Sequence, residues 1–290
     1  RVRHTHAHAN PAISQDVRHA STSIAAKLQD LVLQQEETAM ASTIDIYPVH
    51  HVPATRPFIW LAAGWDSMMH SRGPSLTYGV IFTLLGAMIL AYQEHPLYNA
   101  AAICAFLVVG PIITAGICEL ARRRDHGESS TFGDSLQAVS KNKAHLLGLA
   151  EVLAFVAVAG FSLAALFLYV TTGSAAPPIE STVWGDVLRQ LSTLQVVTYS
   201  VAFLGVSGIV FLLSLVTVPM IIDRHIEPGA AMRMSLRVAT RDLPAMIIWA
   251  GLIISLVAFG YGTQLWGMIV VLPLLGHATW YAYRDIVEEQ

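Results

Sequence analysis

Ionisable side chains inside long apolar segments are the residues of this sequence with the clearest potential for chemistry. Glu151 lies about one turn inside such a segment, and Asp223 and His277 each lie four residues after a proline near the end of one. Charged groups are costly in an apolar environment, so those that occur there commonly bind a proton, an ion or a ligand. Glu151 could therefore form a proton or cation site, or it could pair with Lys143 or His145.

His277 and Tyr281 form a second candidate pair, because residues four apart share one face of a helix. They could hydrogen-bond to each other or to Asp223, and we favour this structural clamp over a ligand site. His145, His225 and His277 lie at similar depth and could supply imidazole ligands to zinc, iron or a haem. Because these histidines form no HxxxH or ExxH pair on one helix, we predict no metal and no cofactor other than bound phospholipid.

The sequence has none of the short motifs that are typical of nucleophilic, metallopeptidase or nucleotide chemistry. The patterns GxSxG, HExxH and GxGxxG and the phosphate-binding P-loop are all absent. We therefore predict that the protein is not an enzyme.

The composition places these residues in a membrane. The chain has 290 residues, of which 54% are hydrophobic and only 13% are charged, whereas soluble domains have about 25% charged residues. Several nearly uncharged stretches are long enough to cross about 30 Å of hydrocarbon as helices. The formal net charge of -3 favours no particular partner, and we expect no nucleic acid to bind. The fold class is therefore all-α, in a polytopic membrane protein.

Apolar segments and basic loops predict the topology. Six spans are expected, at about residues 75–92, 97–118, 147–170, 196–222, 244–261 and 266–283. After residue 50, twelve Lys or Arg residues lie on one set of connections and only Arg189 lies on the other. Because basic loops stay in the cytoplasm, this asymmetry predicts that both termini are cytoplasmic.

A weak internal repeat organises the spans into three hairpins. Each outward span follows a short amphipathic segment, namely Phe58–Ser71, Phe132–Asn142 or Met232–Asp242. Each returning span has a proline near its inner end, at Pro111, Pro219 and Pro273. We predict one membrane domain over residues 57–290, built of three hairpins that are each preceded by an interfacial helix.

The interfacial segments supply candidate contact residues. Arg233, Arg237 and Arg241 follow one another at intervals of four residues, and Trp65 shares a helix face with Phe58. A basic stripe favours an anionic membrane surface, so these residues could bind lipid or a partner. Their simpler role is to anchor the topology.

Residues 1–56 are predicted to form a separate, polar arm on the cytoplasmic side. Apolar residues recur at helical spacing between about residues 13 and 35, which indicates one amphipathic helix. Ile24 and Leu28 lie on its apolar face and are candidates for docking to a partner.

Four segments resemble a known family. They are GPSLTYGVIFTLLG (73–86), GPIITAGICELARRRDHGE (110–128), VPMIIDRHIEPGAAMRMSLRVATRD (218–242) and VVLPLLGHATWYAYRD (270–285). They are similar to a family of bacterial predicted integral membrane proteins, domain of unknown function 2189, over about residues 57–288.

The resemblance implies a six-helix inner-membrane protein of a Gram-negative bacterium, with no established activity and no catalytic residues to carry over. It marks as signature positions Asp223, Pro273, His277, Tyr281, Tyr283, Arg284 and Asp285.

Our leading hypothesis is a non-catalytic accessory or assembly subunit of the bacterial inner membrane. It would bind lipids and the membrane-protein subunits of a larger complex, such as a respiratory or other energy-transducing complex. The alternative is a small transporter or channel that uses Glu151 and the proline-broken helices. A weaker alternative is a metal- or haem-binding membrane protein.

Overall fold

The computed structural model describes residues 27, 29, 50–91, 96–173 and 192–287, without the side chains of residues 89–108. The chain divides into two compact units, Arg1–Tyr47 and Pro48–Gln290. The predicted arm helix, with Ile24 and Leu28, lies outside the described residues. Residues 50–56, which we assigned to the arm, belong to the second unit, where the His50 amide donates to the Ile286 carbonyl at 2.9 Å.

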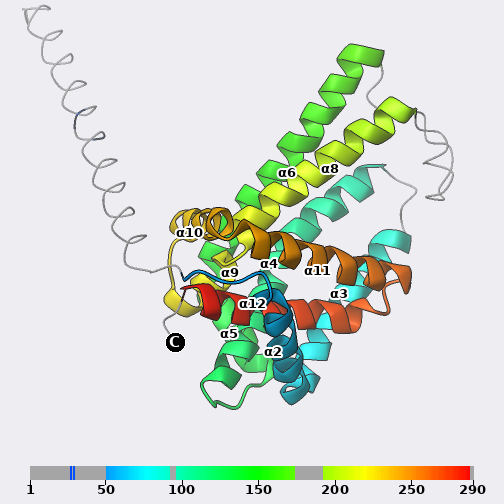
Figure 1. The fold of residues 1–290 in the computed structure, drawn as a ribbon. Helices are drawn as coiled ribbons and strands as arrows, with labels where there is room; N and C mark the ends of the chain where they lie inside the picture. Colours follow the sequence, from blue (N-terminus) through cyan, green and yellow to red (C-terminus); the bar gives the residue numbers. More distant parts are fainter. Residues whose placement is uncertain (1–26, 28, 30–49, 92–95, 174–191, 288–290) are drawn as a thin grey trace, which may run out of the picture. The chain divides into compact units, whose positions relative to one another are not determined.

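Every regular element among the described residues is a helix (Figure 1). The elements are α2 (Arg56–His70), α3 (Arg72–Ala91), α4 (Pro96–Asp125), α5 (Phe132–Lys141), α6 (Lys143–Thr172), α8 (Thr193–Ser214), α9 (Thr217–Arg224), α10 (Pro228–Arg241), α11 (Leu243–Gly262) and α12 (Met268–Val287). The all-α prediction is confirmed for this part of the chain.

The helices lie where the sequence patterns place them. The three short amphipathic segments correspond to α2, α5 and α10, and the six apolar segments correspond to α3, α4, α6, α8 with α9, α11 and α12. Three of the six predicted spans correspond to helices that, in the part of the chain that the structure describes, are long and apolar enough to cross a membrane: Lys143–Thr172, Thr193–Arg224 and Leu243–Gly262. Several apolar helices of a membrane protein are thus present.

The prolines of the returning helices act differently from one another. Pro111 and Pro273 lie inside the continuous helices α4 and α12. Only Pro219 follows a helix break, since α8 ends at Ser214 and α9 begins at Thr217. A proline removes one backbone donor and crowds the carbonyl four residues earlier, which here is that of Leu215. The prediction of a broken helix therefore agrees with the structure only at Pro219.

Helix α12 is the centre of the packing. It lies against α2, α3, α4, α9 and α11 (Figure 1), and His277, Trp280 and Tyr283 on it are fully buried. Glycines allow its neighbours to approach closely. A Cβ atom at Gly64 of α2 would lie 2.6 Å from the Ala278 backbone nitrogen, and one at Gly79 of α3 would lie 2.0 Å from the Ile269 carbonyl oxygen.

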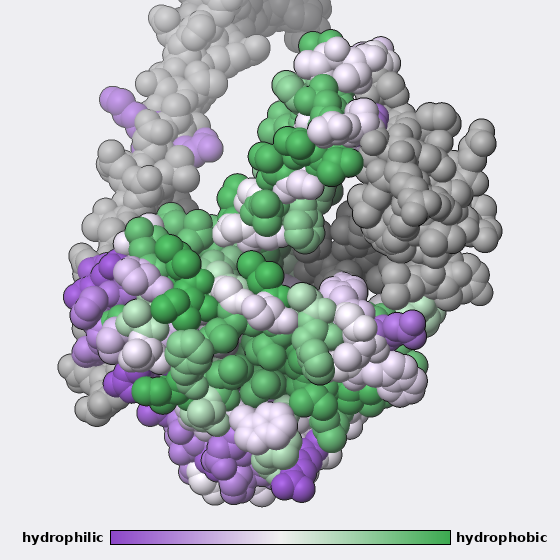
Figure 2. Space-filling model, turned by 45° about the vertical axis from the view of Figure 1, so that its right-hand side comes forward, coloured by the Kyte–Doolittle hydropathy of each residue, from purple (hydrophilic) through white to green (hydrophobic). Residues whose placement is uncertain are grey.

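Helices α6 and α8 pack against each other and lie side by side in Figure 1. Only 22% of the most apolar 18-residue stretch of Lys143–Thr172 is buried, and the same fraction is buried in that of Thr193–Arg224, which comprises α8 and α9. Figure 2 shows hydrophobic residues over much of one face of the molecule, with hydrophilic residues gathered toward its edges. The outer surfaces of these helices are therefore apolar, as a lipid-facing surface would be.

Candidate functional site

His277 is held between two serines that precede it by about 200 residues. Its Nδ1 atom forms a 3.0 Å hydrogen bond with Ser67 Oγ of α2, and its Nε2 atom forms a 2.9 Å hydrogen bond with Ser75 Oγ of α3. All three residues are fully buried. Both ring nitrogens are thus occupied by serine hydroxyls, and neither Tyr281 nor Asp223, the partners that the sequence suggests, bonds to the ring.

Asp223 forms a separate contact on α9. Its Oδ2 atom accepts a 2.8 Å hydrogen bond from the Tyr283 hydroxyl of α12, and it also pairs with Arg224 Nε at 2.9 Å. Asp223 therefore links α9 to α12 instead of joining a polar site around His277.

Tyr281 lines a cleft of about 210 Å³ at the C-terminal end of α12. The cleft is lined by Arg56, Ile59, Trp60, Ala63, Asp125, Tyr281, Arg284 and Asp285. The charged residues that line the cleft form ion pairs and hydrogen bonds with one another. Asp285 accepts a 2.8 Å hydrogen bond from the Trp60 indole and lies 3.3 Å from Arg56 Nε, while Arg284 forms an ion pair with Asp125. These contacts tie α2, α4 and α12 together.

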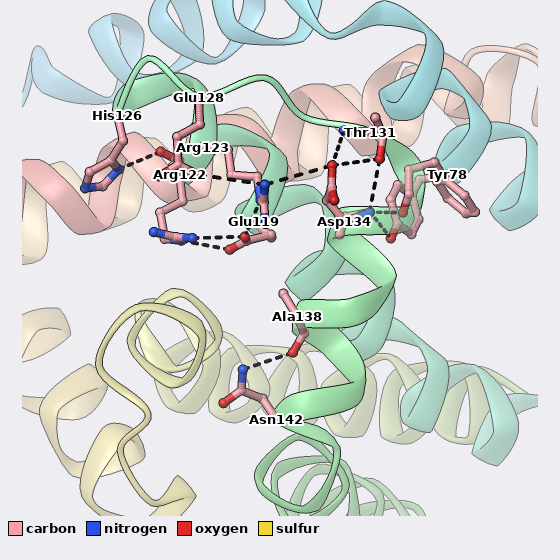
Figure 3. Close-up of polar contacts among 12 residues, drawn as sticks. Tyr78, Glu119, Arg122, Arg123, His126, Glu128, Thr131, Asp134, Ala138 and Asn142 are labelled. Carbon is pink, nitrogen blue, oxygen red and sulfur yellow. Dashed lines mark hydrogen bonds and ion pairs between the residues drawn. The ribbon is translucent and has the colours of Figure 1, made fainter.

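A second charged cluster lies at the C-terminal end of α4 (Figure 3). Glu119 accepts hydrogen bonds from Arg122 Nε at 2.7 Å and from Arg123 Nε at 2.8 Å. Burial by itself would raise the pKa of the Glu119 carboxyl, but the hydrogen bonds and charges of the two arginines outweigh it and lower that pKa. The carboxylate is therefore ionised and neutralised by its own helix, which is a structural arrangement.

The start of α5 is fixed by a capping box that also faces this cluster. Thr131 Oγ1 accepts from the Asp134 amide, and Asp134 accepts from the Thr131 amide at 3.0 Å. The Asp134 carboxylate also accepts a 2.7 Å hydrogen bond from the Thr131 hydroxyl, and this bond together with the one from the Thr131 amide lowers the pKa of Asp134. Arg123 Nη1 lies 3.9 Å from Asp134 Oδ2, so the cap and the α4 cluster form one network (Figure 3).

Glu151 lies on the exposed side of α6. The same stripe carries the exposed Leu147 and Phe155, four residues before and after it, and Phe155 is 73% exposed. Within the described residues, no ion pair joins Glu151 to Lys143 or His145. The structure thus places a carboxylate on an apolar outer surface, at the position where α6 becomes uniformly apolar.

The three candidate histidines do not converge. His225 Nδ1 forms a 2.9 Å hydrogen bond with Asn142 Oδ1, His277 lies between its serines, and His145 Nδ1 is buried without a hydrogen-bond partner. No group of three or more His, Cys, Asp or Glu residues that could hold a metal ion occurs in the described part of the chain.

The basic stripe of α10 lies on the outer side of that helix. Arg233, Arg237 and Arg241 are all exposed, whereas Met234 and Val238 are buried. On α2, Trp65 is exposed with Phe58 and Ile59, opposite the buried Trp60 and Met68. Both amphipathic helices therefore bury one face in the protein and expose the other.

Sequence reasoning missed the partners of the buried polar residues. Ser67 and Ser75 belong to an i, i+4, i+8 series with Ser71, whose hydroxyl lies 3.2 Å from that of Ser75. That spacing was the available signal for a polar stripe facing His277. Asp242 was also missed: it is buried, accepts from the Val52 amide at 3.3 Å and forms an ion pair with His51.

No curated protein and no solved structure matches the chain. One family model does match, and it covers α5, α6 and α8, most of α4, and α9 as far as Asp223. The resemblance found on sequence motifs is confirmed for this stretch, while the segment 270–285 lies outside it. Residues 99–223 match the family described as predicted integral membrane protein (DUF2189).

Proposed function

We propose that this chain is a non-catalytic, multi-pass membrane protein that acts as an accessory subunit. It binds another membrane protein through the outer face of the α6–α8 hairpin. In this proposal α3, α4, α6, α8 with α9, α11 and α12 cross the bacterial inner membrane as three hairpins, and both termini are cytoplasmic.

The observation that carries the proposal is the exposed Glu151 within an apolar helix face. Exposed large apolar side chains surround it on α6, and others continue on α8. Those on α6 include Leu147, Phe155 and Val158, and those on α8 include Val197, Val201 and Leu204. Lipid alone is a sufficient neighbour for the apolar side chains. It is a poor neighbour for a carboxylate, which costs several kcal/mol in hydrocarbon unless it is hydrated or paired.

The position of Glu151 indicates the chemistry of its partner. Helix α6 begins at Lys143, so Glu151 lies about two turns along it, near the predicted cytoplasmic boundary. Membrane helices commonly carry Lys or Arg at that boundary because basic residues stay inside. We infer that the partner is a membrane helix with a basic side chain near its cytoplasmic end, which would pair with Glu151.

The transporter alternative uses Glu151 within the bilayer and the proline-broken helices. The exposed place of Glu151 on α6, opposite the buried Leu149 and Leu153, favours contact with an external partner instead. No group of three or more His, Cys, Asp or Glu residues that could hold a metal occurs in the described part of the chain, so the metalloprotein alternative gains no support from it.

The test is co-purification of the native complex. Membranes containing the tagged full chain are extracted in mild detergent, and the peak is analysed by native mass spectrometry and by its visible absorption spectrum. We expect a partner in fixed stoichiometry, and an absorption band if the partner carries haem. Substitution E151Q should weaken the association by roughly tenfold, because an ion pair that is shielded from bulk water at an interface contributes on the order of 1–2 kcal/mol to the binding free energy. E151K should weaken it further by repulsion.

The matched control is E227Q. Glu227 is an exposed carboxylate at the start of α10 whose side chain forms no cap hydrogen bond. A chain that runs alone, or as a homo-oligomer, overturns the accessory role. A partner that is retained equally by E151Q, E151K and E227Q overturns the assignment of the α6 face.

A further inference from the structure

We propose that the outer face of α10 is a binding site for the phosphate groups of anionic phospholipids. The inference deepens the proposed function: it rests on α8 with α9 and α11 crossing the membrane, and it does not depend on any protein partner.

The position of α10 follows from the helices on either side of it. The candidate span Thr193–Arg224 ends four residues before α10 begins at Pro228, and the candidate span Leu243–Gly262 begins two residues after α10 ends at Arg241. A fourteen-residue helix between two consecutive spans lies at the membrane surface on which both spans end.

The orientation of α10 is fixed by its inner face. Ala231, Met234 and Val238 are buried, and α10 packs against α8, α9 and α6. Ser235 Oγ donates a 2.7 Å hydrogen bond to the Leu212 carbonyl and accepts one from the Val216 amide at 3.4 Å. These contacts hold the buried face of α10 against the break between α8 and α9, so its arginines lie on the outer side.

The outer face combines charge with apolar side chains. Arg233, Arg237 and Arg241 rise along it over about 12 Å, at 1.5 Å per residue. The exposed Leu236 lies between two of them, and the exposed Leu243 follows at the start of α11. α10 contains no acidic residue. Guanidinium groups bind phosphate through paired hydrogen bonds, and neighbouring leucines can enter the acyl region, as expected of a helix at an anionic leaflet.

The test measures lipid binding by the purified full chain in detergent. Phosphatidylglycerol or phosphatidylcholine is titrated in, and bound lipid is counted by native mass spectrometry. We expect wild type to prefer phosphatidylglycerol, and the preference to weaken as salt is raised. The double variant R233Q/R241Q should bind phosphatidylglycerol roughly 30-fold more weakly, because each charge near the surface contributes about 1 kcal/mol.

Two control variants make the result specific. R72Q/K141Q removes two exposed charges from α3 and α5 and should bind like wild type. R233K/R241K keeps the charge of the stripe but loses the paired hydrogen bonds of the guanidinium groups, so its affinity should lie between those of R233Q/R241Q and wild type.

Equal losses in R233Q/R241Q and R72Q/K141Q would show diffuse attraction and overturn the site, as would equal binding of the two lipids by wild type. Poly-glutamate serves as a competitor. If it displaces phosphatidylglycerol from wild-type protein, and if its own binding depends on Arg233 and Arg241 in the same way, the stripe is a site for an acidic protein segment and the proposal is overturned. Failure of the co-purification test leaves these lipid measurements unaffected, so the two proposals fail separately.

Discussion

The buried polar side chains of this protein join one helix to another. His277 of α12 meets serines on α2 and α3, Tyr283 of α12 donates to Asp223 of α9, and Tyr78 of α3 lies 2.8 Å from Ser135 of α5. In an apolar interior, an unpaired polar group costs about 1–3 kcal/mol, so these pairs select one arrangement of helices that otherwise have similar apolar surfaces.

His277 provides the sharpest test at this scale. H277A would leave the hydroxyls of Ser67 and Ser75 without their ring partner and would open a cavity, so we expect a loss of about 3–5 kcal/mol in the free energy of unfolding. The measurement is thermal or denaturant unfolding of the purified chain in detergent. S75A removes one hydrogen bond and should lower the free energy of unfolding by about 1–2 kcal/mol. This milder variant tests the same contact if H277A does not fold.

The control for this prediction is H70A. His70 is exposed and its Nδ1 contacts the Asp66 carbonyl of its own helix, so its removal should change stability by less than about 0.5 kcal/mol. Equal stability of H277A and H70A would contradict the clamp.

At the scale of elements, the close approach of α12 to its neighbours depends on positions without a side chain. Gly64 and Gly79 face the α12 backbone at Ala278 and Ile269, and Gly276 of α12 faces Ile117 of α4, where a Cβ would lie 2.6 Å from that side chain. Backbone atoms cannot move aside as side chains do, so the contacts of Gly64 and Gly79 are the least adaptable. Small residues at helix contacts are how membrane helices obtain dense packing.

Two helical glycines test this account by responding in opposite ways to the same substitution. In G79A the new methyl group would overlap the Ile269 carbonyl, so α3 must separate from α12 and we expect a loss of about 2–3 kcal/mol. In G251A the methyl group meets nothing within 4 Å on the exposed side of α11, and higher helix propensity should stabilise the protein by up to about 1 kcal/mol. Unfolding in detergent measures both, and similar effects of the two substitutions would contradict the packing of α3 on α12.

For the whole molecule, the proposed arrangement is three hairpins whose connecting helices α5 and α10 share the cytoplasmic side. α10 joins the end of one candidate span to the start of the next, and α5 ends at Lys141, directly before the candidate span that begins at Lys143. The far end of α6, at Thr172, would then lie on the opposite side of the membrane.

Single cysteines on the two sides test that topology. Ser140 of α5 and Thr172 of α6 are both exposed. Of the two native cysteines, Cys104 and Cys118, Cys118 is fully buried. An impermeant thiol reagent applied to intact cells should label T172C, whereas S140C should react only after the membrane is opened, with wild type as the background. Labelling of both variants from the same side would contradict the proposed crossing of α6.

The local pattern of the sequence was sufficient to place the elements. Prolines and charged residues flank each apolar segment, and amphipathic spacing marks α2, α5 and α10. The positions of these three helices agree with the prediction to within a few residues, apart from an earlier start of α10. These signals arise from neighbours along the chain. The partners of His277, in contrast, lie 210 and 202 residues away, and no local pattern connects them.

The sequence alone thus determined an all-helical membrane protein, the location of its helices and the exposed arginine series of α10, because a helix surface is set by residues three and four apart. The tertiary structure alone decided which sides of α6 and α8 are covered and which residues pair inside. α6 is apolar on almost every side, because a bilayer and a protein interior favour the same side chains. Hydropathy therefore could not show that Glu151 faces outward, and only the packing of α6 against α4 and α8 could.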